Sequence, residues 1–91
     1  MIEKHLIPHQ ASGFVMEYFD DEALLYHQVK TQAVYLNETA VLIWALCDGK
    51  NNIMDIEKLL SESYPEAGVS IPADIRLSLE RFVEIGAIEF K

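Results

Sequence analysis

One segment, residues 35–49, restricts the fold of this chain more than any other. It starts with Tyr35-Leu36, passes through Asn37 into an almost wholly apolar stretch, and ends at Asp48-Gly49. The Asn37 side chain can accept a hydrogen bond from an amide of the first helical turn, and Gly49 can adopt the left-handed conformation that ends many helices. We therefore expect a helix that ends at about residue 46 or 47. Because apolar residues cover nearly its whole circumference, we expect it to be the central buried helix.

Length and charge limit the classes of function. A chain of 91 residues fits a single domain, 1–91, and a hydrophobic share of 51% is enough to build a core. Fifteen acidic residues stand against 7 Lys and Arg, which gives a formal net charge of −8. This balance disfavours nucleic acid and anionic membrane surfaces, both of which attract basic proteins. A basic or mixed-charge peptide is a better match.

The single cysteine, Cys47, cannot form an internal disulfide, which favours a reducing compartment. Residues 1–10 lack the continuous apolar core of a signal peptide, and no apolar run approaches the ~18–20 residues that span a bilayer. We therefore expect a cytoplasmic protein with no membrane contact. Because Cys47 lies near the negative end of the expected helix, a buried structural thiol is favoured over a nucleophile.

The remaining pattern indicates an α+β fold of winged-helix-like shape, with three short antiparallel N-terminal strands followed by three helices. Residues 1–13, with Pro8 and Gly13, are expected to form an irregular lead-in. Strands are expected over 14–19, 23–29 and 33–36, separated by short turns. Two more helices are expected, over 53–63 and from Pro72 to about residue 85, and 87–90 form either a short strand or a wing remnant. The expected inner faces of these two helices are Ile53, Ile56, Leu59 and Leu60, and Ile75, Leu79, Phe82 and Val83.

The third helix carries a second stripe beside its expected inner face. This stripe mixes an acid, a base and apolar groups, and consists of Asp74, Leu77, Ser78, Arg81 and Ile85. A peptide-binding groove needs such a mixture, although a solvated flank with one exposed leucine has the same pattern. The short strand 33–36 offers a related possibility. If it is an edge strand, it can accept an extended peptide as an added strand; otherwise the chain's own segments cover it.

Catalytic and metal-binding patterns are weak. His5 and His9 are spaced as on a helix, but Pro8 lies between them, and His27 stands alone on an expected strand. The acids lie on helix faces and turns without forming a distinct pair, and no glycine-rich phosphate loop is found. We therefore expect no catalytic residue, no metal and no cofactor.

Several segments together resemble one known family. The segment Tyr35-Leu36-Asn37-Glu38-Thr39-Ala40, followed by Ile43-Trp44 and Cys47-Asp48-Gly49, is similar to the PqqD family. Downstream positions agree in type and spacing, namely Ile56, Tyr64-Pro65, Asp74-Ile75, Leu79, Phe82, Gly86 and Ile88. The similarity covers about residues 14–90.

The resemblance implies a peptide chaperone, or precursor-peptide recognition element, rather than an enzyme. Members bind the leader of a ribosomally made precursor and present it to a modifying enzyme, which is a radical SAM protein in pyrroloquinoline quinone biosynthesis. The leader adds beside the third strand and packs on the third helix. Carried over to this chain, the implied peptide-binding residues are Gln32, Ala33, Val34, Tyr35, Asp74, Leu77, Ser78 and Arg81.

Ser78 stands where the family often has a larger apolar residue, which implies a shallower pocket here. The alternatives are the recognition element of a lasso-peptide or other peptide-modification system, a winged-helix DNA-binding domain, and a structural adaptor. Short exposed strands are also compatible with a homodimer.

Overall fold

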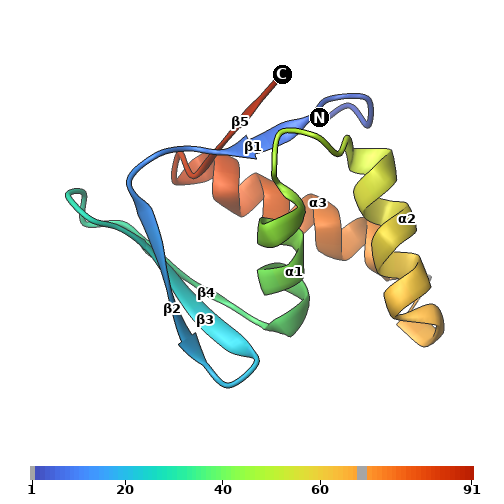
Figure 1. Ribbon diagram of the computed structural model, residues 1–91, viewed down its shortest axis with the longest axis horizontal. Coiled ribbons are helices and arrows are strands. Elements are labelled where there is room, and N and C mark those ends of the chain that lie inside the picture. Colours follow the sequence, from blue (N-terminus) through green and yellow to red (C-terminus); the bar gives the residue numbers. More distant parts are fainter. Residues whose placement is uncertain (1, 68–69) are drawn as a thin grey trace.

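The computed structural model describes residues 2–67 and 70–91 (Figure 1). Within them, the expected α+β fold class is confirmed, with three antiparallel strands preceding three helices. Two further short strands lie near the chain ends. In chain order the elements are β1 (Pro8–Gln10), β2 (Phe14–Phe19), β3 (Glu22–His27), β4 (Ala33–Leu36), α1 (Glu38–Leu46), α2 (Ile53–Ser63), the 3-10 turn η1 (Pro65–Ala67), α3 (Ile71–Glu84) and β5 (Ile88–Phe90).

The larger sheet has the strand order β2-β3-β4, so β4 is an edge strand. Leu25 of β3 lies opposite Val34 of β4 on one side and Met16 of β2 on the other. Alternate residues of β3 and β4 are buried, namely Ala23, Leu25, Val34 and Leu36. All three helices lie on one side of this sheet, so its other face is turned outward (Figure 1).

The smaller sheet joins the two ends of the chain. Strand β1 pairs antiparallel with β5, with Pro8 opposite Phe90 and Gln10 opposite Ile88, and His9 also forms a bridge with Asp48. The expectation of an irregular lead-in over 1–13 is therefore wrong for residues 8–10. Pro8 is compatible with a strand because it occupies the first position, where a missing N–H is tolerated. The short strand considered for the tail is present at β5.

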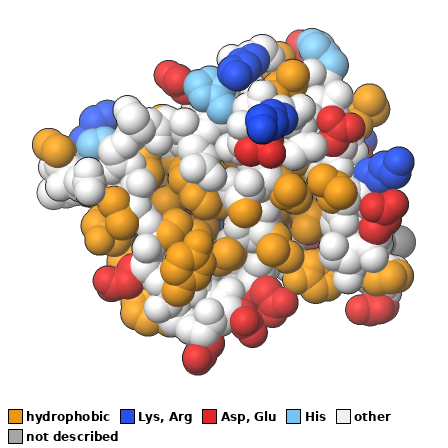
Figure 2. All heavy atoms as spheres, viewed as in Figure 1, with side chains coloured by type: hydrophobic (Ala, Val, Ile, Leu, Met, Phe, Trp, Pro, Cys, Tyr) orange, Lys and Arg blue, Asp and Glu red, His pale blue; other side chains and the backbone are white. Residues whose placement is uncertain are grey.

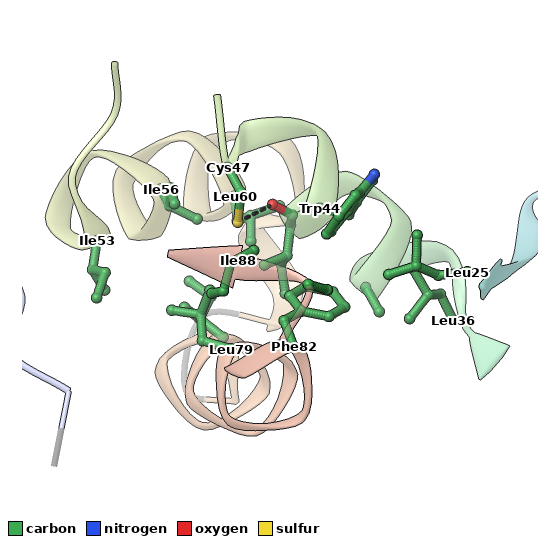
Figure 3. Packing of buried hydrophobic residues seen from close by; sticks show 14 of the residues in the cluster. Leu25, Leu36, Trp44, Cys47, Ile53, Ile56, Leu60, Leu79, Phe82 and Ile88 are labelled. Carbon is green, nitrogen blue, oxygen red and sulfur yellow. Dashed lines mark hydrogen bonds between the residues drawn. The ribbon is translucent and has the colours of Figure 1, made fainter. Parts of the chain in front are cut away.

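The core lies between the larger sheet and the helices (Figure 3). Helix α1 begins as expected, because Asn37 Oδ1 accepts a hydrogen bond from the Ala40 N–H at 2.9 Å. The Trp44 ring meets the Phe82 ring of α3 edge-on, with centroids 5.3 Å apart. The buried Cys47 thiol donates to the Ile43 carbonyl at 3.2 Å, so Trp44 and Cys47 both serve the core.

Three expectations about burial are wrong. Leu42 of α1 is 36% exposed, so α1 is not buried around its whole circumference. Leu59 of α2 is 39% exposed and Val83 of α3 is 45% exposed, although both were expected on inner faces. Helical periodicity shows which residues share a side, but how much of that side is covered depends on where the neighbouring elements lie.

Candidate functional site

A hollow of about 240 Å³ lies between the end of β4, the start of α1 and one side of α3. It brings together the strand and the mixed stripe of the third helix, which are far apart in the sequence. Five of the eight implied peptide-binding residues line it: Tyr35, Asp74, Leu77, Ser78 and Arg81. The remaining lining residues are Asn37, Thr39 and Ala40.

The other three implied residues follow the edge strand without lining the hollow. Ala33 is exposed on the outer side of β4, whereas Val34 is buried in the core. Gln32 immediately precedes β4, and its carbonyl accepts a hydrogen bond from the His27 N–H at 3.1 Å. Its side-chain oxygen is buried and has no hydrogen-bond partner within the described residues.

The alternation of β4 determines which backbone groups are open to a ligand. In an antiparallel pair, the N–H and C=O of one residue point to the same side, and successive residues alternate between sides. Because the Gln32 carbonyl faces β3, the backbone groups of Val34 also face β3. Those of Ala33 and Tyr35 therefore face the open edge, beside the hollow.

Charges of both signs line the hollow. Asp74 lies in the first turn of α3 and Arg81 lies two turns further along the same side. Leu77, which is 53% exposed, lies between them and presents an apolar surface to a ligand. The arrangement combines a polar edge for main-chain hydrogen bonds with an apolar contact flanked by an acid and a base.

Sequence reasoning assigned no ligand contact to Asn37, Thr39 and Ala40. Asn37 was interpreted only as a helix cap, which it is. Their position directly after the expected strand 33–36 was the available signal, because a helix that starts there places its first turn beside the strand end. Their closeness to α3 depends on tertiary packing between α1 and α3, which no local pattern reports.

Two observations concern metal binding and thiol reactivity among the described residues. No group of three or more His, Cys, Asp or Glu residues within them could hold a metal ion. Burial raises the pKa of Cys47 to about 12, with a further contribution from Asp48, so the thiol stays protonated at neutral pH. In the part of the chain that the structure describes, no helix is both long and apolar enough to cross a membrane.

A second, larger hollow of about 450 Å³ lies on another side of α3, next to α2 and the N-terminal segment. Its lining includes Ile2, Ile53 and Arg76. Lys4 and Glu57 also line it, and their side chains form an ion pair at 3.1 Å. No strand of the larger sheet borders it, so it offers no open backbone edge to an extended peptide.

The fold and the hollow define a small α+β protein in which an open sheet edge lies beside a helix of mixed charge. The chain belongs to the PqqD family: residues 22–88 match the family described as coenzyme PQQ synthesis protein D (PqqD). This match confirms the resemblance noted in the sequence.

Comparison with curated proteins finds no match. Among solved structures, the chain is similar to one described as TbiB1 in complex with the TbiA(beta) leader peptide. The TM-score is 0.73, the sequence identity is 20%, and the similarity covers 89% of this chain and 94% of that chain. At this identity, the similarity establishes a shared fold.

Proposed function

We propose that this protein is a peptide chaperone that binds the leader of a ribosomally made precursor peptide and presents it to a modifying enzyme. The observation that carries the proposal is the open edge of β4 next to the hollow on α3. Membership of the PqqD family supports it, as does the similarity to a protein whose structure contains a leader peptide.

Affinity comes from strand addition. An extended peptide beside β4 exchanges hydrogen bonds with the open backbone groups of Ala33 and Tyr35, and these bonds are independent of the peptide's side chains. Alternate side chains of the added strand turn toward α3, where Leu77 supplies an apolar contact and Ser78 leaves room above the helix.

Selectivity comes from the two charges on α3. Asp74 and Arg81 are seven positions apart, which corresponds to about 10 Å along a helix. An extended peptide covers this distance in about three residues. Side chains on one face of a strand are an even number of positions apart, so the preferred leader carries a basic and an acidic residue about two or four positions apart. They are oriented so that the acid meets Arg81 and the base meets Asp74.

In this scheme the protein performs no chemistry itself. The modifying enzyme is a radical SAM protein of the kind implied by the family, and both proteins act in the cytoplasm. The role of the chaperone is to hold the leader in one extended conformation, which removes part of the entropy that the enzyme would otherwise have to overcome.

The test combines calorimetric titration with amide hydrogen exchange. The ligand is the leader segment of each short precursor encoded beside this gene. We expect binding at micromolar concentration or below, with new protection of the Ala33 and Tyr35 amides and little change at Val34, which already pairs with β3. If no neighbouring precursor binds, or if the new protection lies away from β4, the proposal is wrong.

A further inference from the structure

A second surface of α1 is left without a partner in the described part of the chain. A groove of about 340 Å³ runs between α1 and α2, on a different side of α1 from the peptide-binding hollow. Figure 2 shows hydrophobic side chains spread across this face of the molecule, from the larger sheet over α1 toward α2. The groove is lined by Leu42, Ala45, Leu46, Leu59, Leu60, Glu62 and Ser63.

The composition of α1 makes this exposure informative. A helix that is apolar on every side is normally covered on every side, and a helix at a protein surface normally has a polar face. After Glu38 and Thr39, the remaining residues of α1 are all apolar. Even so, Ala45 is exposed and Leu42 is 36% exposed. An exposed apolar surface with a polar rim is typical of an interaction site.

We propose that the groove between α1 and α2 is the docking site for an amphipathic helix of the modifying enzyme, with leucine-type anchors on one face and lysine or arginine residues at one end. This inference rests on the proposed function. It identifies the second surface that a chaperone needs, because leader and enzyme have to be held at the same time.

The charges around the groove select this occupant. Glu62 lines the groove, and Glu38 lies at the same end, where its Oε1 accepts a hydrogen bond from the Tyr64 hydroxyl at 3.0 Å. Asp21 adds negative charge near Tyr64. No Lys or Arg of the described residues lines the groove, and the last turn of α2 contains none. Figure 2 shows acidic side chains along the lower edge of this face.

These charges disfavour a second copy of the chain as the occupant. Each copy has a formal net charge of −8, so the same acidic rim would meet another strongly acidic molecule. A partner with apolar anchors and a basic end gains both burial and charge complementarity. A helix in a groove is also a common way in which apolar anchors spaced by three and four residues are bound.

The two sites use different residues of α1. Thr39 and Ala40 line the peptide-binding hollow, whereas Leu42, Ala45 and Leu46 line the groove. A bound leader and a docked helix therefore do not compete for the same side chains. A short rigid helix separates the two ligands, so the leader is held at a fixed position relative to the enzyme.

The first experiment uses a synthetic amphipathic helix of about four turns, with leucines on one face and lysines at one end, added to the nitrogen-labelled protein. We expect the amide signals of Leu42, Ala45, Leu46 and Leu59 to shift, and a matched peptide with glutamates in place of the lysines to bind at least tenfold more weakly. Equal binding of the two peptides, or shifts confined to another surface, would overturn the proposal.

Variants locate the contact. Leu42→Ser and Leu59→Ser should each weaken binding of the lysine peptide about tenfold, because each removes an anchor contact from the groove. Met54→Ser is the matched control: Met54 is an exposed apolar residue of α2, at 55%, that does not line the groove, and its loss should change affinity less than twofold. Equal effects at the three positions would contradict the assignment.

A final comparison separates this inference from the proposed function. Leader titration with Leu59→Ser should give the wild-type affinity, whereas modification of the precursor by the purified enzyme should slow at least tenfold. If Leu59→Ser binds the leader and the enzyme modifies the precursor at the wild-type rate in its presence, the docking proposal alone fails. If the wild-type protein binds no leader, the proposed function fails first. A dimer in sedimentation that Leu42→Ser dissociates would assign the groove to a second copy instead.

Discussion

The phenolic hydroxyl of Tyr35 donates a hydrogen bond to the carboxylate of Glu22, across the outer face of the larger sheet. Tyr35 belongs to the edge strand β4 and Glu22 begins the neighbouring strand β3. The bond holds the tyrosine ring over the outer face of the sheet, toward β3. Because the carboxylate stabilises the protonated phenol, it raises the pKa of Tyr35 above its ordinary value.

Replacing Glu22 with Gln should lower the pKa of Tyr35 toward its ordinary value, because the negatively charged acceptor is removed. The measurement is an ultraviolet titration of the wild type and of E22Q. The difference between the two curves should disappear when both carry Tyr35→Phe, which assigns it to this residue. Identical curves for the wild type and E22Q would show that the bond is not populated in solution.

The basic residues of α3 provide a matched pair for testing the peptide site. Arg81 lines the hollow between β4 and α3 that we propose binds the leader, whereas Arg76 lines the larger hollow on another side of the helix. Arg81→Glu should weaken leader binding about tenfold, because an acidic leader residue loses its partner and meets a like charge. Arg76→Glu alters the net charge equally but should change affinity less than about twofold. Calorimetry distinguishes a local contact from a general charge effect, because a general charge effect would weaken leader binding equally in both variants.

Two glycines with positive φ should differ in their tolerance of a side chain. Gly13 has φ +90°, and a Cβ there would lie 2.5 Å from His27 Nε2. That ring cannot move freely, because its Nδ1 accepts hydrogen bonds from the N–H groups of Val29 and Lys30 at 3.0 Å. Gly13→Ala should therefore lower the free energy of unfolding by about 2–3 kcal/mol.

Gly86 is the control for this prediction. Its φ is +73°, but a Cβ there would meet no atom within 4 Å. Gly86→Ala should cost only the backbone strain, about 1 kcal/mol. Urea unfolding of both variants measures the difference. Equal losses would mean that the His27 ring yields to the added methyl group.

Cys47 should make stability sensitive to alkaline pH. Its folded-state pKa of about 12, set by burial and then by Asp48, exceeds the value of 9.0 for an unperturbed thiol. The unfolded chain therefore loses this proton first, so the free energy of unfolding is unaffected by this group well below pH 9 and falls as pH rises toward 12. The loss between pH 9 and 10 should be about 1 kcal/mol. Cys47→Ala should show a shallower fall in urea unfolding over that range, and parallel pH profiles would contradict the burial argument.

Local signals located the three strands of the larger sheet and the three helices, although the strand expected over 23–29 is Glu22–His27 in the structure. The strands at 14–19 and 33–36 and the helix at 53–63 were predicted with the bounds that the structure has, because alternation, caps and turns all lie within a few residues of each element. Strand β1 could not be found in this way. Its partner β5 lies at the other end of the chain, and three residues that include Pro8 carry no periodic pattern.

Part of the candidate site could be predicted from the sequence. The stripe with Asp74, Leu77 and Arg81 followed from helical periodicity, and the resemblance to a family directed attention to residues 32–35. The structure adds that β4 is an edge strand and that the start of α1 completes the hollow. Neither fact is local, because both depend on which elements pack beside β4. The same dependence explains why Leu59 and Val83 are exposed on faces that were expected to be buried.

The pairing of β1 with β5 brings the two ends of the chain together. The Lys91 N–H donates to the Ile7 carbonyl at 2.9 Å, and the Ile7 N–H donates to the Lys91 carbonyl at 3.4 Å, so Ile7 and Lys91 lie side by side, and the described ends of the chain lie on the same side of the molecule (Figure 1). A host protein could therefore carry this unit as an insertion in a single surface loop, with the strand pairing of both sheets unchanged. For the same reason, the chain should tolerate circular permutation. A short linker would join the present ends, and the new ends would lie at the Asp20-Asp21 turn, far from both β1 and β5.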